Sequence, residues 1–191
     1  MSVSPLPLQR HSIDQYFTQE TASEQRHEYR DGRIITMTGG TPEHNELSGS
    51  LVVLFRLALK GKPYQVFVAD QRLWIPNHRL YTYPDLMVMA KPIERQEGRN
   101  DTVMNPIFIA EVLSKSTRSY DRDEKFEAYR TLTTFQDYLL IDQYRIHVEH
   151  YVKQGNNQWL FTEYDDLAAQ VTIASLPVVV NLADLYEGIE F

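Results

Sequence analysis

Two carboxylates stand inside segments that are otherwise apolar. Asp85 lies in YPDLMVM, and Glu111 follows 26 residues later in PIFIAEVLS. Both segments are typical of buried strands. An ionised carboxylate on a buried strand costs several kcal/mol even after the surroundings relax, so it needs a compensating partner. A basic side chain, a shared proton or a bound cation would each compensate.

The alternation of side chains along a strand places each acid on the same face as apolar residues. These neighbours are Met87 and Met89 for Asp85, and Ile107, Ile109 and Leu113 for Glu111. Both acids are therefore expected to lie on apolar faces, where an ionised carboxylate requires a compensating partner.

The segment STRSYDRDEKFEAYRTL, after the Glu111 strand, is expected to form a helix. Asp121, Lys125 and Tyr129 are spaced by four residues and lie along one face of it. Lys125 can point back toward the end of the Glu111 strand. Two carboxylates bind Mg²⁺ or Mn²⁺, and such an ion takes phosphate oxygens and keeps several waters. A water on the ion can attack phosphorus while the ion and the lysine stabilise the developing charge.

An ordered set of motifs in the chain resembles the PD-(D/E)XK nuclease superfamily. These are PD at residues 84–85, EVL at 111–113 and DEKFEAY at 123–129. The match is closer to the Uma2 branch, formerly DUF820, which is abundant in cyanobacteria. The stretches that resemble this branch are HEYRDGRIITMTGGTPEHNELSGSL, YPDLMVM, IAEVLSKSTRSYDRDEKFEAYRTL and DYLLID. The resemblance runs from about residue 12 to the end of the chain.

This resemblance implies an α/β (α+β) protein with a restriction-endonuclease-like core, in which helices flank a mixed central β-sheet. It implies a metal site for Mg²⁺ or Mn²⁺ built from Asp85, Glu111 and the main-chain carbonyl of Val112. The lysine of the superfamily, expected two residues after the second acid, is replaced here by Leu113. In the Uma2 branch the lysine has moved to the following helix, which matches Lys125.

The resemblance also supplies further candidate residues. The upstream acid of the family corresponds to Glu28. His44, near the start of a long helix, and Tyr129 are candidate contacts to a water or to the substrate. The family's two-fold assemblies imply a homodimer, for which aromatic strands such as QWLFTEY offer an interface.

Each candidate residue also has an ordinary structural role open to it. Asp85 could form a turn at the start of its strand, and Tyr129 could pack in the core. Glu111 could form an ion pair with Lys115, Arg118 or Lys125, and Glu28 could form a surface pair with Arg26, Arg30 or Arg33. Lys125 and His44 could each occupy an exposed helix position.

Local signals predict the elements that must position these residues. Residues 12–22 read as a short helix capped by Ser12, and Asp31-Gly32 is the turn of a β-hairpin. A longer helix begins after a Thr41 cap, with Pro42 at its first position and an apolar face. That face comprises Leu47, Leu51, Leu54 and Ala58. The strand, helix and strand over residues 107–142 predict a parallel crossover.

Composition narrows the class of protein. The 191 residues are 42% hydrophobic and 24% charged, which predicts one globular domain over 1–191, flexible at 1–11. The absence of cysteine excludes disulfides and Cys-ligated zinc. The apolar runs are too short for a membrane span, and we expect a cytoplasmic protein. A net charge of −7 argues against a large basic surface but suits acids that hold a divalent cation.

We therefore predict a divalent-metal-dependent endonuclease that hydrolyses phosphodiester bonds, with DNA as the expected substrate; the choice between DNA and RNA does not follow from the sequence. The first alternative is a non-catalytic nucleic-acid-binding or assembly protein that keeps the fold, since the chain is acidic and the lysine is displaced. The second is a two-carboxylate glycosidase. That alternative is weakened because only Trp74 and Trp159 are available to stack on a sugar.

Overall fold

The computed structural model describes residues 10–155 and 157–191. Residues 1–9 of the segment expected to be flexible lie outside this part of the chain, and His11 is hydrogen-bonded to the carbonyl of Gly32. Among the described residues, no helix has the length and apolar character that crossing a membrane requires. The cytoplasmic location stays a prediction.

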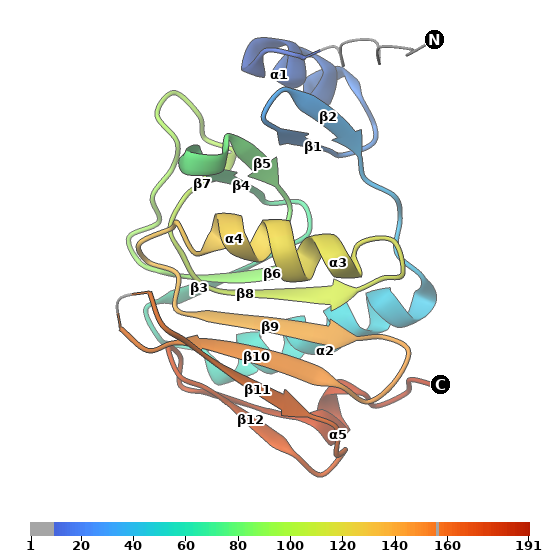
Figure 1. Ribbon diagram of the computed structural model, residues 1–191. Helices are drawn as coiled ribbons and strands as arrows, with labels where there is room; N and C mark the ends of the chain where they lie inside the picture. The colour runs from blue at the N-terminus through green and yellow to red at the C-terminus, as the bar shows by residue number, and fades with distance from the viewer. Residues whose placement is uncertain (1–9, 156) are drawn as a thin grey trace, which may run out of the picture.

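A mixed six-stranded sheet forms the centre of the molecule (Figure 1), with strand order β11-β10-β9-β8-β6-β3. Only its neighbours β8 and β9 run parallel, and the other pairs are antiparallel. The strands are β3 (Tyr64–Val68), β6 (Leu86–Ala90), β8 (Pro106–Leu113), β9 (Asp137–Asp142), β10 (Val148–Lys153) and β11 (Trp159–Tyr164). The predicted crossover is thus confirmed as a parallel pair, in which Leu113 lies opposite Asp142.

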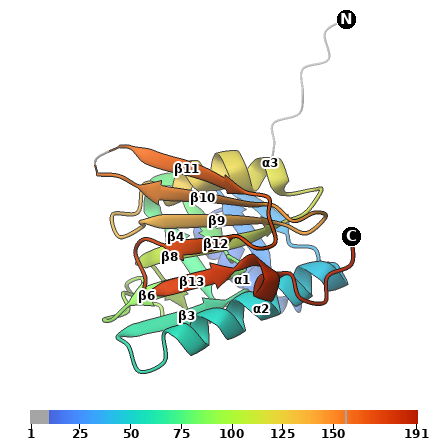
Figure 2. The same ribbon diagram turned by 90° about the horizontal axis from the view of Figure 1, so that it is seen from below.

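The two faces of this sheet are covered by different elements (Figures 1 and 2). One face packs on α2 (Pro42–Ala58), on the hairpin of β12 (Gln170–Ile173) and β13 (Val178–Asn181), and on α5 (Leu182–Leu185). The other face packs on the helical segment made of α3 (Arg118–Tyr120), a π-helical turn η2 (Asp121–Lys125) and α4 (Phe126–Tyr129). A mixed sheet flanked by helices is therefore confirmed.

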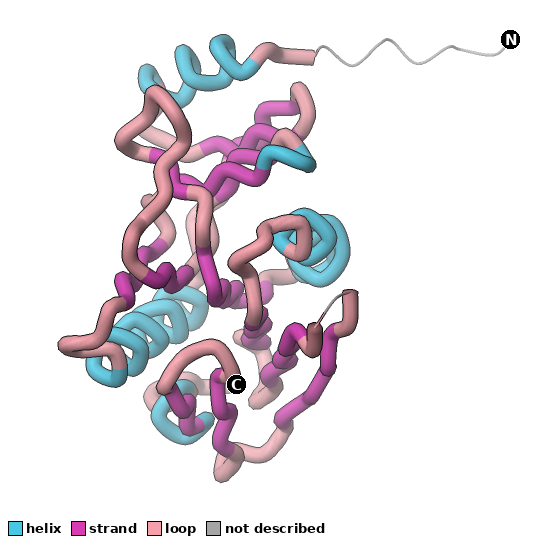
Figure 3. The backbone as a smooth tube through the Cα atoms, turned by 90° about the vertical axis from the view of Figure 1, so that its left-hand side faces the viewer, coloured by secondary structure: helices cyan, strands magenta, loops and turns pink. Residues whose placement is uncertain are grey.

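A smaller sheet with strand order β2-β1-β5-β4-β7 lies beside the helical segment α3–α4. Figure 3 shows it with the N-terminal helix as a layer of its own at one end of the molecule. Its elements are α1 (Ile13–Ala22), β1 (His27–Arg30), β2 (Arg33–Thr36), β4 (Arg72–Ile75), the 3-10 turn η1 (Pro76–His78), β5 (Leu80–Thr82) and β7 (Thr102–Val103). Tyr16, Tyr29 and Tyr81 form the buried aromatic contact between α1 and this sheet.

The predicted caps and turns explain where these elements begin. Ser12 and Gln15 form a reciprocal capping box on α1, and the Thr41 hydroxyl accepts the His44 amide at the start of α2. The hairpin turn needs a positive φ at both central residues, 41° at Asp31 and 93° at Gly32, and an Asp-Gly pair tolerates this geometry.

Side-chain alternation separates the core into two clusters. In β6, Leu86 and Val88 face α2, whereas Met87 and Met89 face α4. One expectation is wrong: Ile107 packs on the α2 side, because the register shifts beside it and Met89 pairs with Pro106. The extra residue of this bulge reverses the alternation locally.

The α2 face differs slightly from the expected stripe. Leu47, Leu51 and Phe55 are its fully buried residues, while Leu54 and Ala58 lie at its margin. The face is therefore rotated slightly from the predicted one, with the Phe55 ring packed at a tilt against Phe108 of β8 at a centroid distance of 4.7 Å.

Replacing Leu51 by alanine should lower the free energy of unfolding by about 2–5 kcal/mol, because it opens a cavity between α2 and the sheet. Val53→Ala on the exposed side of the same helix is the matched control and should change it by less than about 0.5 kcal/mol. Urea unfolding followed by circular dichroism measures both. Equal losses in the two variants would contradict the assignment of the buried face.

Candidate active site

Asp85 and Glu111 meet at one end of two neighbouring antiparallel strands. Asp85 directly precedes β6, and Glu111 is the sixth residue of β8. The Asp85 amide donates to Glu111 Oε2 over 3.2 Å, and the Val112 amide donates to Asp85 Oδ2 over 2.8 Å. The backbone of each strand end thus fixes the carboxylate of the other, and the two acids are adjacent as expected.

Lys125 brings its ammonium group to this strand end. Its Nζ lies 3.1 Å from Glu111 Oε1, 3.1 Å from Asp121 Oδ1 and 3.6 Å from Glu28 Oε1. Only 7% of the side chain is exposed. The reach that the displaced lysine required is therefore present: the helical segment returns over β8 closely enough for a direct ion pair. Leu113, at the usual lysine position, is instead part of the core facing α4.

The helix that carries Lys125 is not a regular α-helix. Residues Asp121–Lys125 form a π-helical turn between two short α-helical pieces. Such turns inside helices are frequent at functional sites. Asp121 is almost fully buried at the start of this turn, and its Oδ1 accepts no hydrogen bond from the described residues although it faces Lys125. Sequence reasoning noted its spacing from Lys125 but did not include it in the site.

Two further side chains hold the acids in place. The Tyr129 hydroxyl donates to Glu111 Oε1 over 2.7 Å, so this core tyrosine is also part of the site. Glu28, on β1 of the small sheet, accepts a hydrogen bond from the Thr82 hydroxyl. The structure therefore brings Glu28, Glu111, Lys125 and Tyr129 together, and Thr82 is a member that no sequence signal indicated.

His44 completes the cluster from the first turn of α2. Its Nε2 lies 3.2 Å from Asp85 Oδ2. Burial alone would lower the pKa of His44, but the hydrogen bond and charge of Asp85, with the charges of Glu111 and Asp121, raise the pKa above its ordinary value. Asp85 and His44 each keep 18% of the side chain exposed, so solvent reaches the cluster on their side.

Negative charge is in excess within this cluster. Four carboxyl groups surround one ammonium group and one imidazole. Burial, reinforced by Asp85 and Asp121 against the opposing effect of Lys125, raises the pKa of Glu111 to about 8. The pKa of Lys125 is raised well above its ordinary value: burial opposes this, but the charges of Glu111 and Asp121 outweigh it. One ammonium thus leaves the cluster short of positive charge.

The donor set suits a hard divalent cation, because it consists of carboxylate oxygens. Within residues 10–155 and 157–191, no three side chains of His, Asp or Glu are arranged to hold a metal ion by themselves. Two side-chain ligands and a main-chain carbonyl, as the family resemblance implies, are compatible with that observation. Val112 follows Glu111 at the end of β8, and its amide donates a hydrogen bond to Asp85.

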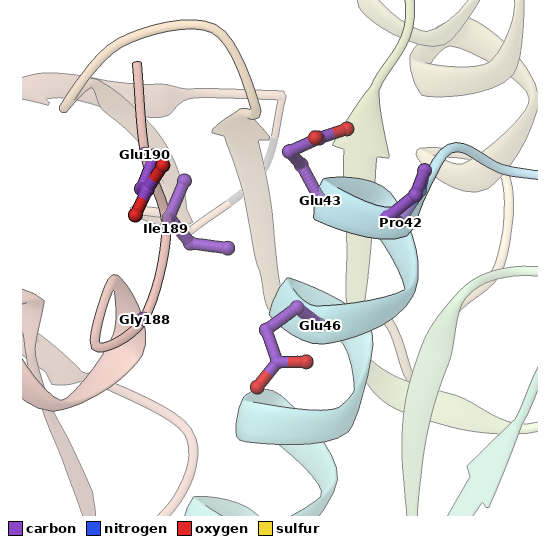
Figure 4. A pocket seen from close by; sticks show the side chains of 6 residues that line it. All are labelled: Pro42, Glu43, Glu46, Gly188, Ile189 and Glu190. Carbon is purple, nitrogen blue, oxygen red and sulfur yellow. The ribbon is translucent and has the colours of Figure 1, made fainter.

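A separate pocket lies beside the first turns of α2 and faces the C-terminal segment (Figure 4). Its lining residues are Pro42, Glu43, Glu46, Gly188, Ile189 and Glu190. None of them belongs to the carboxylate cluster, and we assign the candidate active site to the cluster instead.

In EDTA, the free energy of unfolding should fall as the pH rises from about 4.5 to about 8. The pKa of Glu111 is higher in the folded chain than its ordinary 4.5, so the folded state binds the extra proton in this window. Each pKa unit corresponds to about 1.4 kcal/mol, so the loss amounts to a few kcal/mol. Glu111→Gln should flatten this slope, and Glu46→Gln, an exposed site on α2, should not. Identical pH profiles for all three proteins would contradict the charge excess.

Gly40→Ala should detach His44 from Asp85. A Cβ at Gly40 would lie 2.7 Å from His44 Nδ1, whereas a Cβ at Gly39 would meet nothing within 4 Å. The displaced imidazole loses the influence of Asp85, so its pKa should fall in Gly40→Ala and stay raised in Gly39→Ala. Proton NMR titration of the imidazole measures both. Indistinguishable titrations would show that the glycine loop does not position His44.

Comparison with known proteins identifies a family model and two related sequences. The model of the Uma2 family, described as "Putative restriction endonuclease", matches residues 13–183. Two proteins of Synechocystis sp. are similar in sequence: "Uncharacterized protein sll1609" is 38% identical over 164 residues, which cover 86% of this chain and 93% of that protein. "Uncharacterized protein slr1290" is 31% identical over 185 residues, covering 97% and 96%.

A solved structure shares the fold. The crystal structure of a "putative nuclease belonging to DUF820" from Anabaena variabilis superposes with a TM-score of 0.73 and covers 93% of this chain and 98% of that one, at 20% identity. The expected nuclease-like fold is thus confirmed. Matched over most of its length and to relatives above 30% identity, the chain belongs to the Uma2 family.

Proposed function

We propose that this protein is a divalent-metal-dependent endonuclease that hydrolyses phosphodiester bonds in DNA. The observation that carries the proposal is the convergence of Asp85 and Glu111 with the amine of Lys125 at one strand end. The description of the Uma2 family and of the Anabaena relative supports a nuclease. A homodimer with one site for each strand of a duplex remains part of the proposal.

Asp85, Glu111 and the carbonyl of Val112 would hold Mg²⁺ or Mn²⁺. The excess of buried negative charge supports this assignment, because a cation would offset it where Lys125 alone does not. When bound, the ion would polarise the phosphoryl group and lower the pKa of the attacking water, which makes that water a better nucleophile at neutral pH. Because binding requires ionised carboxylates, it would also displace the proton that the raised pKa leaves on Glu111.

The chain's own residues would prepare the site before any substrate arrives. Asp121 and Glu28 keep the Lys125 amine charged and directed toward Glu111, and this amine would stabilise negative charge developing on phosphoryl oxygens. Tyr129 fixes the Glu111 carboxylate by its hydrogen bond. His44 orients Asp85 from the exposed side, where it would contact a water or a phosphate.

The non-catalytic alternative has one observation in its favour. Lys125 is buried and already surrounded by three acids, which makes it a structural counterion as well as a candidate for catalysis. The glycosidase alternative loses support, because Trp74 is stacked on Tyr81 in the small sheet and Trp159 packs on Phe126 and Phe135. Neither tryptophan lies among the contacts of the carboxylate cluster.

Plasmid and oligonucleotide DNA should be cut in the presence of Mg²⁺ or Mn²⁺ and left intact in EDTA. Asp85→Asn, Glu111→Gln and Lys125→Met should each reduce the cleavage rate at least about 100-fold, since the first two weaken a carboxylate ligand of the metal ion and the third removes the positive charge next to the reacting phosphate. Glu46→Gln is the control for removal of a carboxylate from the surface of α2. Unfolding curves show which variants remain folded under the assay conditions.

Equal cleavage by the wild type and the folded site variants would contradict the proposed active site. DNA binding without cleavage, together with no measurable affinity for Mn²⁺, would instead favour the non-catalytic alternative. RNA substrates of the same sequence, tested in parallel, decide between the two nucleic acids.

A further inference from the structure

A cluster of positive charge lies at the end of β8 and β9, outside the carboxylate cluster. Lys115 follows β8 in the loop of residues 114–117, and Arg118 begins α3. The Lys115 amine lies 5.3 Å and the Arg118 guanidinium 5.7 Å from the ring centre of Tyr144, which follows β9. Both distances are in the range of cation–π contacts. We call Lys115, Arg118, Tyr144 and the neighbouring Arg145 the basic rim.

The loop that carries the basic rim is ordered by its own hydroxyl groups. Ser114 Oγ lies 3.0 Å from Ser116 Oγ and 2.9 Å from Thr117 Oγ1, and it accepts the Thr117 amide over 3.2 Å. The Arg118 amide donates to the Ser114 carbonyl over 3.0 Å. These bonds form a closed turn, so Lys115 and Arg118 are held at defined places next to the strand end.

Positive charge in the basic rim is only partly neutralised. The nearly buried Asp142 lies 3.8 Å from Arg118 Nη2 and 3.6 Å from Arg145 Nε, so a single carboxylate serves two arginines at long distance. The Arg118 Nε, which is itself shielded from solvent, has no hydrogen-bond partner among the described residues. Side-chain exposure is 39% for Arg118 and 63% for Arg145. The solvent-exposed parts of the Arg118 and Arg145 side chains are available to bind an anion.

The basic rim borders the candidate active site through the backbone. The Gln143 side chain donates to the carbonyl of Leu113, two residues after Glu111, and accepts the Thr41 hydroxyl at the start of α2. The loop of residues 114–117 leads directly into the turn that carries Asp121 and Lys125. In Figure 1 the ends of β8 and β9, the start of α3 and the start of α2 lie together at the right-hand side.

We propose that Lys115, Arg118 and Arg145 bind backbone phosphates of a nucleic-acid strand next to the phosphodiester held at Glu111 and Lys125. The inference rests on the proposed nuclease function and adds the surface that positions its substrate. Lysine and arginine contacts to phosphates position a strand without reading its sequence. The basic rim thereby gives a chain of net charge −7 a local place to hold a polyanion.

Tyr144 acts in this scheme by holding the cations rather than by reading a base. Its ring already has two cations near it, and its amide donates to Asp142 Oδ1, which fixes the turn after β9. Tyr144→Phe keeps the ring and should bind DNA as the wild type does. Tyr144→Leu removes the aromatic face and should weaken binding.

The test measures binding separately from cleavage. Fluorescence anisotropy of a labelled DNA duplex is recorded from 50 to 200 mM salt, with the wild type in EDTA and with Glu111→Gln in Mg²⁺. Lys115→Ala, Arg118→Ala and Arg145→Ala should each reduce the magnitude of the negative slope of log K against log [salt] by about 1, equally for unrelated sequences. The triple variant should lose about 3.

Arg56→Ala and Lys60→Ala are the matched controls. Arg56 is exposed in the last turn of α2, about 18 Å along the helix from His44, and Lys60 is exposed just after the helix ends at Ala58; both substitutions should leave the slope unchanged. Three results would contradict the proposal that the basic rim binds phosphates. They are an unchanged slope in the triple variant, an equal change of slope in the controls, and no DNA binding by the wild type. Binding that follows the predicted slopes without any DNA cleavage would instead contradict the proposed nuclease function. The basic rim would then be a nucleic-acid-binding surface of a non-catalytic protein.

Discussion

The buried ion pairs of Lys125 are the interaction on which the site depends. Glu28, Glu111 and Asp121 come from the small sheet, the main sheet and the helical segment, and all three approach the same ammonium group. Removing one partner from such a network leaves uncompensated charge in a low dielectric, which costs about 3–5 kcal/mol. The lysine therefore holds three layers of the fold in register while it remains one positive charge against an excess of acids.

The topology explains why this cluster forms at one edge. The parallel crossover from β8 to β9 carries the helical segment back over the strand end, and the antiparallel neighbour β6 starts at the same edge with Asp85. The N-terminus of α2 is tied to that edge through Thr41 and Gln143, which brings His44 to Asp85. Acids that would destabilise an isolated strand are thus concentrated where a substrate can approach, an arrangement typical of functional sites.

Local rules predicted much of this arrangement, and long-range packing decided the rest. The caps at Ser12 and Thr41 and the apolar runs around Asp85 and Glu111 define their elements from neighbouring residues alone. The candidacy of Lys125 came from its helical spacing and from the family resemblance, whereas its reach to Glu111 depends on how the helical segment packs over β8. Asp121 and Thr82 were missed, since nothing local says that a helix start or a strand of another sheet faces the cluster. The bulge at Ile107 likewise depends on pairing with β6.

The most direct test is a crystal soaked in Mn²⁺, with anomalous diffraction recorded at a wavelength where manganese scatters strongly. The account predicts one strong anomalous peak within coordination distance of the Asp85 and Glu111 carboxylates and the Val112 carbonyl, with Lys125 still paired to Asp121. It predicts no such peak in crystals of Glu111→Gln treated in the same way. A fully occupied ion elsewhere, with the hydrogen bonds and ion pairs of Asp85 and Glu111 unchanged, would contradict it.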